Sequence, residues 1–365
     1  MSLSIAIVGL PNVGKSTLFN ALTKKSVPAE NYPFCTIDPS VGVVPVPDER
    51  LEKLAAISSS KKIIPAIVEF MDIAGLVKGA SEGQGLGNQF LSHIRETDAI
   101  AEVVRIYENS DLIHVEGTVD PLRDIEIINM ELILADMQTV DKRIQTIGKD
   151  VKRGDKDAIK FHGLLEQLKN HLADEKLANR LPFNEEEIKL VRELHLITMK
   201  PFLYVLNKQS SGKNLDEMSD GRFEKLLAYF KENTFHHVVV DAKIEDELKD
   251  FEGVERDEMR HELGAHDSGV DGLIKAGYEL LGLETYLTTG EMETRAWTIK
   301  KGSTGPVAAS AIHSDFEAKY IRAEVVAYND LITTGSFAEA KAQGKLRTEG
   351  KEYIVKDGDV IEFRI

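Results

Sequence analysis

The sequence predicts an α/β protein in three parts: a domain with a largely parallel sheet, a helical insertion within it, and a small β-rich C-terminal domain. Three observations predict this organisation. Short apolar runs alternate with helical patterns over residues 1–130 and resume over 201–280. Apolar residues at alternating spacings of four and three occupy 131–200. From residue 281, short strands and tight turns predominate.

Composition narrows the class of protein. The 365 residues suffice for two or three domains, and they include no apolar run long enough to cross a membrane. A single cysteine, Cys35, excludes an internal disulfide and favours a reducing, cytoplasmic compartment. The net charge of -16 disfavours a chain that coats nucleic acid. Residues 131–200 balance 13 basic against 13 acidic residues, so that segment and the C-terminal domain are expected to face an anionic partner.

The first element is a P-loop at residues 9–17, Gly-Leu-Pro-Asn-Val-Gly-Lys-Ser-Thr, directly after an apolar strand at 3–8. A strand before this motif and a helix after it allow backbone N–H groups to surround phosphate oxygens, which disfavours the alternative of a glycine-rich turn without a ligand. Lys15 is expected to reach the β and γ phosphates, and the Ser16 hydroxyl to bind Mg²⁺. The expected nucleotide contacts here are Asn12, Val13, Gly14, Lys15, Ser16 and Thr17.

Two further segments are expected to act on the same phosphates. Asp72-Ile73-Ala74-Gly75 follows the apolar strand 67–71 and fits a metal-side aspartate, with a glycine whose N–H contacts the γ-phosphate. Thr36 lies where a switch loop would close on Mg²⁺, although an ordinary loop hydroxyl is the alternative. The predicted Mg²⁺ ligands are therefore Ser16, Thr36 and Asp72.

The helical insertion predicts an antiparallel hairpin arm over 131–200. A second apolar stripe follows a turn at 152–156 and could pack back on the first. The alternative is two ordinary helices that cover the sheet. The first stripe consists of Ile133, Met137, Val140, Ile144, Ile147 and Val151, and the second of Phe161, Leu164, Leu165, Leu168 and Leu172.

The C-terminal domain is expected to hold strands at 296–299, 322–327, 352–355 and 360–365, with one helix near 337–343. Asp357-Gly358 between the last two strands is typical of a hairpin turn.

These motifs together resemble the Obg-related ATPase family YchF, of the translation-factor-related GTPase class. The resemblance rests on residues 9–16, on Asn-Tyr-Pro-Phe-Cys-Thr at 31–36, on 72–81 and on Ile-Arg-Glu-Thr-Asp-Ala at 94–99. Residues 295–298, 312–316 and 357–361 are similar to the TGS domain of that family. The resemblance covers the whole chain and implies a G domain at 1–130 and 201–280, a coiled-coil insert at 131–200, and a β-grasp, ubiquitin-like TGS domain at 281–365. It also implies ATP preference and the ribosome as partner, with large-subunit surfaces and a monomer expected.

Two positions bear on hydrolysis. Leu76 follows the metal-side segment where related enzymes carry a glutamine that orients water, which a hydrocarbon cannot do. His114 matches the histidine proposed to replace that glutamine in the resembled family, and imidazole chemistry allows it. A lone loop histidine can also be a surface hydrogen-bonding group. Slow turnover is therefore expected.

Asn12 matches the position that binds K⁺ in potassium-stimulated members of the wider class, where K⁺ replaces an arginine finger. The alternative is a turn-forming side chain that tolerates unusual backbone angles.

Two segments bear on whether the protein binds adenine or guanine nucleotides. They are Asn207-Lys208-Gln209-Ser210, after the strand 202–206, and Asp241-Ala242-Lys243. Guanine-specific relatives end the first motif in an aspartate that accepts from guanine N–H groups, and Ser210 cannot do so. The resembled family usually ends it in glutamate, and Asp241 departs from that family's usual serine. ATP preferred over GTP is the expectation, with Asn207, Lys208, Asp241, Ala242 and Lys243 as nucleotide contacts.

The predicted function is a cytoplasmic, Mg²⁺-dependent, ATP-preferring hydrolase that acts as a nucleotide-controlled, ribosome-binding switch. One alternative is a nucleotide-gated RNA- or protein-binding module in which hydrolysis is incidental, and another is GTP as the physiological nucleotide. A small-molecule kinase is disfavoured, because the insertion lacks the arginine cluster of a kinase lid.

Overall fold

The computed structural model describes residues 3–23, 40–73, 86–109, 117–210, 212–251, 253–265 and 268–365. By their contacts, the residues form two compact units, one of 3–42 and 69–273 and the other of 43–68 and 274–365. The helical insertion groups with the first unit. Residues 43–68, which the sequence boundaries placed in the nucleotide domain, group with the second unit.

The sheet of the first unit runs in the order β2-β4-β1-β5-β7-β9. From β4 onward the neighbouring strands are parallel, as the alternation of apolar runs and helices predicted. Its central strands β1, β5 and β7 are almost wholly buried, which explains why they appear in the sequence as continuous apolar runs. The strands are β2 (Val41–Pro45), β4 (Ile67–Asp72), β1 (Ser4–Val8), β5 (Ala99–Arg105), β7 (Phe202–Asn207) and β9 (His236–Val240).

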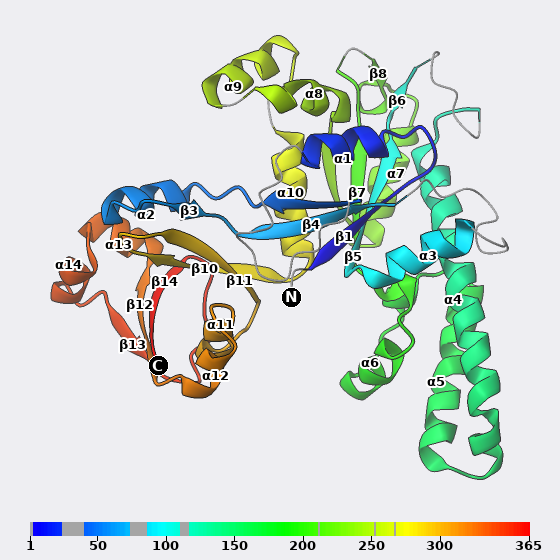
Figure 1. Cartoon of the computed structure of the whole chain (residues 1–365). Coiled ribbons are helices and arrows are strands. Elements are labelled where there is room, and N and C mark those ends of the chain that lie inside the picture. The colour runs from blue at the N-terminus through cyan, green and yellow to red at the C-terminus, as the bar shows by residue number, and fades with distance from the viewer. Residues whose placement is uncertain are drawn as a thin grey trace. The chain divides into compact units, whose positions relative to one another are not determined.

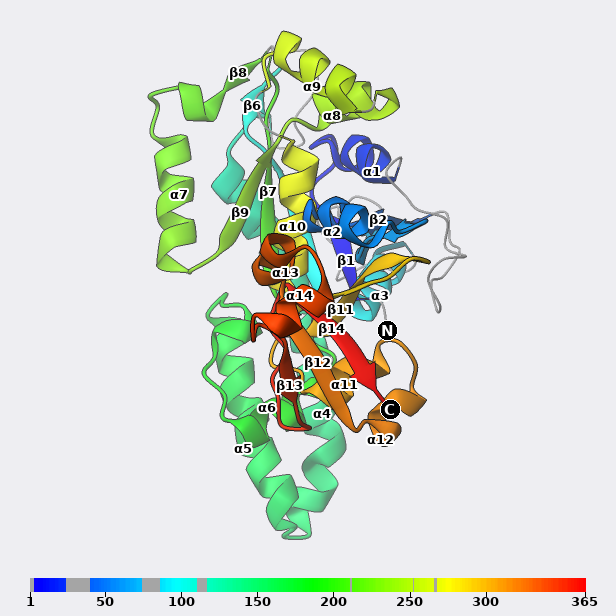
Figure 2. The same cartoon turned by 90° about the vertical axis from the view of Figure 1, so that its left-hand side faces the viewer.

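Helices cover both faces of this sheet. On one face α1 (Lys15–Thr23) packs against α8 (Ala242–Glu247), and on the other α7 (Arg222–Glu232) packs against α4 (Pro121–Lys152) (Figure 2). The first unit also contains α3 (Leu86–Glu96) and α9 (Gly253–Glu262), whereas α10 (Gly269–Leu280) includes residues of both units. The carboxyl ends of parallel strands meet at one edge, where α/β proteins bind their ligands.

The insertion is a long helical hairpin, in which α4 and α5 (Lys156–Ala173) run side by side (Figure 1). Asp120 and Asp155 cap the two helices, each accepting a hydrogen bond from a backbone N–H in the first turn. The turn falls at 153–155, inside the predicted range. Along the predicted stripes, the buried side chains are Ile133, Val140 and Ile147 of α4 and Phe161, Leu164, Leu165, Leu168 and Leu172 of α5. The region ends with the short helix α6 (Glu185–Arg192).

A buried carboxylate fastens the root of this hairpin. Asp136 of α4 accepts hydrogen bonds from the backbone N–H of Ile197 (2.9 Å) and from both the N–H and the hydroxyl of Thr198 (each 2.7 Å). Burial raises the pKa of Asp136, and these three donors oppose the shift. The hairpin is thereby joined to the turn that leads into β7.

The second unit is a mixed sheet in the order β13-β12-β14-β10-β11-β3. Its core includes Tyr286, Tyr320 and Val325. The strands are β13 (Arg347–Glu349), β12 (Arg322–Ala327), β14 (Asp359–Arg364), β10 (Leu283–Thr289), β11 (Thr294–Lys300) and β3 (Ile63–Ile64). The helices are α2 (Arg50–Ser58), α11 (Gly305–Ser310), α12 (Asp315–Lys319), α13 (Tyr328–Thr334) and α14 (Phe337–Ala342), of which the sequence predicted only the last.

The predicted hairpin at the C-terminus is wrong. Residues 352–355 form no strand, and Ile354 makes only an isolated bridge to Thr304. Gly358 does adopt the positive φ (80°) of a turn residue, but the strand that follows pairs with β12 and β10 instead. The reason is that Asp359 accepts hydrogen bonds from the N–H of Lys356 and the hydroxyl of Tyr353, which curls the preceding segment away from the ladder.

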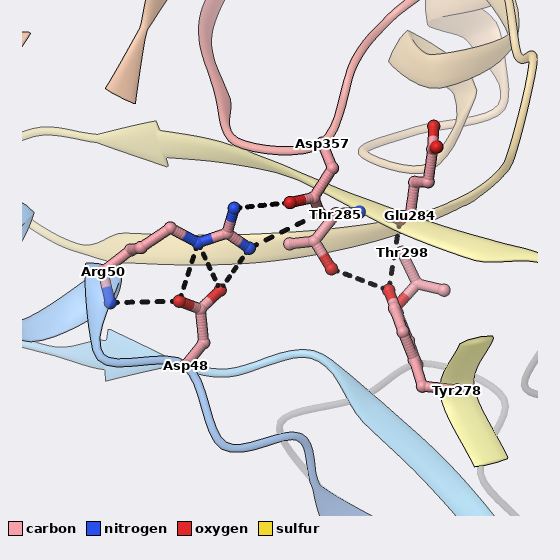
Figure 3. Close-up of polar contacts among 7 residues, drawn as sticks. All are labelled: Asp48, Arg50, Tyr278, Glu284, Thr285, Thr298 and Asp357. Atoms are coloured by element: carbon pink, nitrogen blue, oxygen red, sulfur yellow. Dashed lines mark hydrogen bonds and ion pairs between the residues drawn. The ribbon is translucent and has the colours of Figure 1, made fainter. Parts of the chain in front are cut away.

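Residues 43–68 are held in the second unit by specific polar contacts. Arg50 lies between two carboxylates, with Nε donating to Asp48 (2.8 Å) and Nη1 to Asp357 (2.6 Å) (Figure 3). Both hydrogen bonds raise the pKa of Arg50 above its usual value. Asp357 also accepts from the N–H of Thr285 (3.1 Å), so one arginine joins α2 to β10. At the other end, β3 pairs with β11 through Ile63 and Thr294.

Among the helices that the structure describes, none is long and apolar enough to cross a membrane.

One buried group in the first unit is unfavourable as placed. Glu102 of β5 is 0% exposed, and neither of its carboxylate oxygens has a hydrogen-bond partner among the residues that the structure describes. Burial, followed by the charge of Asp124, raises the pKa of Glu102 well above its usual value. The folded state therefore binds a proton that the unfolded state releases at neutral pH, so Glu102 lowers stability progressively as the pH rises.

We predict that Glu102→Gln stabilises the protein more at pH 8 than at pH 5.5, because glutamine removes the cost of keeping the carboxyl protonated. That cost grows by about 1.4 kcal/mol per pH unit while the folded group stays protonated and the unfolded group is ionised. Urea unfolding at both pH values measures it, with the exposed Glu126→Gln on α4 as control. An equal effect of Glu102→Gln at the two pH values would contradict this account.

Candidate functional site

The loop between β1 and α1 has the close packing that a phosphate-binding turn requires. Gly14 adopts a φ of 99°, and a Cβ at this position would lie 2.3 Å from the Asn207 amide nitrogen. At Gly9, a Cβ would lie 2.6 Å from the Val103 carbonyl oxygen. Only glycine fits at these two positions, because the backbone of the loop passes directly against its neighbours.

Lys15 begins α1, and its side chain is folded back over the loop. It is 8% exposed, and its Nζ donates to the carbonyl oxygen of Leu10 (2.7 Å). Burial lowers the pKa of Lys15 to about 8, opposed by the charge of Asp72. Lysine is a compact charge that responds to burial in this way. An incoming phosphate would supply the negative charge that holds the ammonium ionised.

The two predicted Mg²⁺ ligands that the structure describes come from neighbouring elements. Asp72 ends β4, opposite Ile7 of the parallel strand β1, and its N–H donates to the Ser40 carbonyl (2.9 Å). Ser16 lies in the first turn of α1 and is exposed. Burial raises the pKa of Asp72, and the charge of Lys15 opposes the shift. A hydroxyl and a carboxylate beside a phosphate loop are the oxygen ligands that Mg²⁺ takes together with phosphates.

Asn207, at the end of β7, joins the P-loop to the second nucleotide motif. Its Nδ2 donates to the Val13 carbonyl (2.8 Å), and its Oδ1 accepts from the Ala242 N–H (3.1 Å). Because the side chain is 4% exposed, both hydrogen bonds are shielded from water. The loops 9–14, 207–210 and 241–243 are thus held as one surface.

Asp241, which was expected to contact the nucleotide, accepts hydrogen bonds from backbone N–H groups instead. Its Oδ1 accepts from the N–H groups of Lys243 and Ile244 and caps α8, while its Oδ2 accepts from the Ser210 N–H (2.6 Å). The carboxylate is therefore used to fix the positions of two loops. Its departure from the serine of the resembled family has a structural reason in this chain.

A cavity of about 340 Å³ lies beside Asn207, whose side chain joins the P-loop to α8. Ser210 is absent from its lining, and none of the described residues that line it carries a carboxylate. Its size suits a nucleobase, and its lining includes Gly14 and Thr17 of the P-loop. The lining residues are Gly14, Thr17, Tyr107, Asn109, Asn207, Lys208, Gln209, Ala242 and Lys243.

The structure therefore brings together many of the residues expected to contact nucleotide, from the P-loop, from 207–208 and from 242–243. Asn12 adopts a φ of 63°, the left-handed conformation on which the turn-forming alternative depends. Thr36, Gly75 and His114 lie outside the described residues, so their expected roles stay predictions.

Sequence reasoning missed the far wall of the cavity. Tyr107 and Asn109 follow β5, and Gln209 was treated only as a variable position within its motif. The available signal was the polar run that follows a buried strand at the carboxyl edge of the sheet. Nothing local indicated the partner of Gln209, since Asn214 reaches it through a two-stranded pairing of β6 (Tyr107–Glu108) with β8 (Lys213–Asn214).

We predict that triphosphate binding takes up a proton near pH 9 but not near pH 6.5. With a pKa of about 8, Lys15 is largely neutral at the higher pH and must be recharged by the phosphates, so affinity also falls as the pH rises above 8. Calorimetry in buffers of different ionisation enthalpy measures the uptake. Lys15→Arg keeps its charge and should abolish it. Equal uptake at both pH values would argue against Lys15 as the source.

Two family models match the chain. Residues 4–150 match a model described as "50S ribosome-binding GTPase", and residues 283–365 match the YchF-GTPase_C model, described as "Protein of unknown function (DUF933)".

Relatives that match along almost their full length indicate the same family as the C-terminal model. The "Ribosome-binding ATPase YchF" of Bacillus subtilis (strain 168) is 54% identical over 364 residues, covering 100% of this chain and 99% of that protein. The protein of the same name from Escherichia coli O157:H7 is 48% identical over 363 residues, with the same coverage. Among solved structures, that of the Schizosaccharomyces pombe YchF GTPase is similar with a TM-score of 0.86 and 37% identity, covering 100% of this chain and 98% of that chain. With a P-loop, an Asn207 side chain that joins this loop to α8, and this similarity along its whole length, the chain belongs to the YchF family.

Proposed function

We propose that this protein is a cytoplasmic, Mg²⁺-dependent nucleotide hydrolase that prefers ATP to GTP and acts as a ribosome-binding switch. The observation that supports this most directly is the continuous surface formed by the P-loop, Asn207 and the cavity of about 340 Å³. The two bacterial relatives named above are described as ribosome-binding ATPases and the Schizosaccharomyces pombe relative as a GTPase, and the hydrolase assignment follows theirs.

The preference for ATP is argued from the base cavity. Guanine presents two N–H groups that a single carboxylate accepts together, and the described lining offers none. Asp241 is the nearest acidic residue of the second motif, and its two oxygens already accept three backbone N–H groups. Without a paired acceptor, guanine would lose hydrogen bonds that it makes in water.

Magnesium fits the phosphate end of the site. Ser16 and Asp72 supply hydroxyl and carboxylate oxygens, and Lys15 lies beside them, coupled by charge to Asp72. When bound there, Mg²⁺ would neutralise charge on the β and γ phosphates. These chain residues would position the phosphates. Slow turnover, with His114 positioning water, and a K⁺ ion at Asn12 belong to the same proposal.

We predict that wild-type protein hydrolyses ATP in preference to GTP and that Ser210→Asp shifts the ratio toward GTP by roughly tenfold or more. The added carboxylate completes the guanine motif Asn-Lys-x-Asp, and tenfold corresponds to about 1.4 kcal/mol. Competition between the two Mg²⁺-nucleotides measures the ratio. Ser219→Asp adds the same charge on an exposed residue outside the Asn-Lys-x-Asp motif and should leave the ratio unchanged. A wild-type enzyme that uses both nucleotides equally would refute the ATP preference.

The tip of the hairpin is our proposed ribosome contact, together with the C-terminal unit. The last turn of α4 and the first turn of α5 expose Lys152, Arg153 and Lys156. Cations at the end of an extended arm suit the phosphate backbone of ribosomal RNA. We expect large-subunit surfaces to be involved and the protein to act as a monomer.

We predict that the double variant Lys152→Glu, Lys156→Glu lowers ribosome affinity by on the order of tenfold at moderate salt, because each lost phosphate contact removes part of the salt-dependent binding. Co-sedimentation with ribosomes at two salt concentrations measures this. The exposed pair Lys225→Glu, Lys231→Glu on α7 makes the same charge change away from the tip. If both double variants bind equally, the tip is not the contact.

A further inference from the structure

Two amide side chains face each other across one end of the base cavity. Asn109 follows β6, and Gln209 lies in the loop after β7. The Asn109 Nδ2 donates to the Gln209 Oε1 at 3.4 Å. Each brings a donor and an acceptor to a cavity whose lining also includes two lysines, Tyr107, Thr17 and Asn207.

The backbone of Gln209 is fixed from behind by a buried residue. Asn214 is 1% exposed, and its Oδ1 accepts from the Gln209 N–H while its Nδ2 donates to the Gln209 carbonyl, each at 3.0 Å. Asn214 also pairs with Tyr107 across the β6–β8 ladder. Asn214 thus connects the two sides of the cavity, through its buried side chain to Gln209 and through strand pairing to Tyr107.

The opposite wall is fixed in the same manner. Arg105, 1% exposed, donates from Nε to the Tyr107 carbonyl (2.9 Å) and from Nη2 to the Asn109 carbonyl (3.2 Å). Its guanidinium also stacks over the Tyr107 ring, 4.6 Å from the centroid. Burying an arginine to hold two carbonyls of a short loop is costly, which indicates that the position of the loop matters.

An amide held in one orientation distinguishes the purines. Adenine presents an amino donor beside a ring acceptor, and a glutamine side chain pairs with both. Guanine presents two acceptors, O6 and N7, on the corresponding edge, so the same amide satisfies only one of them. The hydrogen bond from Asn109 to Oε1 favours one orientation of the Gln209 amide, in which Oε1 can accept from the adenine amino group while Nε2 donates to N7. In either orientation, guanine leaves the amide oxygen facing one of its two acceptors.

We propose that Gln209 selects adenine over guanine in this cavity and that Asn109 is its positioning residue. The inference deepens the proposed function and rests on it, since it names the residue that produces the ATP preference. In this chain, the third residue of the Asn-Lys-Gln-Ser motif thus performs the selection that the fourth residue performs in guanine-specific proteins.

The test measures dissociation constants of ADP and GDP by calorimetry on the full chain. Gln209→Leu, which keeps the size and loses both hydrogen-bonding groups, should weaken ADP and lower the GDP-to-ADP ratio of dissociation constants roughly tenfold. Asn109→Ala should lower the ratio in the same direction. Gln145→Leu, on the exposed face of α4, is the matched control.

The ratio of dissociation constants distinguishes a loss of base selection from general damage to the site, since a merely structural change weakens the binding of both nucleotides alike. If wild-type protein prefers ADP and Gln209→Leu keeps the wild-type ratio, Gln209 is not the selecting residue, while the proposed function stands. If wild-type protein binds both equally, the proposed ATP preference itself fails and the inference fails with it.

Discussion

The side-chain amide of Asn207 joins three loops that are far apart in the sequence, and the nucleotide site depends on it. One end holds the P-loop through Val13, and the other holds the start of α8 through Ala242. The amide nitrogen also occupies the space where a side chain at residue 14 would lie, so Gly14 and Asn207 require each other. A buried amide that loses one partner leaves an unsatisfied polar group, at a cost of about 1–3 kcal/mol.

Buried polar groups elsewhere in the first unit show two different solutions. Asp136 is surrounded by three donors from one turn, so its burial gives a specific attachment of the helical hairpin. Glu102 has no such donors among the described residues, and burial raises its pKa well above the usual value. The contrast shows that burial alone does not reveal a role for a carboxylate: the number of donors aimed at it does.

Local pattern predicted much of this protein, for identifiable reasons. The P-loop, its strand and its helix are contiguous in sequence, and the hairpin repeats its apolar spacing over many turns, so both are encoded within a short window. The strand expected at 352–355 failed because Asp359 and Tyr353 form side-chain contacts that periodicity does not record. The sequence did not indicate the roles of Asn214 and Arg105 for a similar reason: their side chains form hydrogen bonds to backbone groups of a loop that the fold brings close. The roles expected for Thr36, Gly75 and His114 lie outside the described residues and remain predictions.

The membership of residues 43–68 in the second unit changes how the chain can be divided. The two family matches, 4–150 and 283–365, suggest a cut in the linking sequence between an independent enzyme and an independent appendage. Such a cut would strip β3 of its only described ladder partner, β11, and Arg50 of Asp357, and it would uncover the buried Leu51 and Leu54 of α2. A chimera between relatives would have to exchange 43–68 and 274–365 together. The unit is therefore discontinuous in the sequence, and a single exchange at the 3′ end of the gene would transfer only part of it.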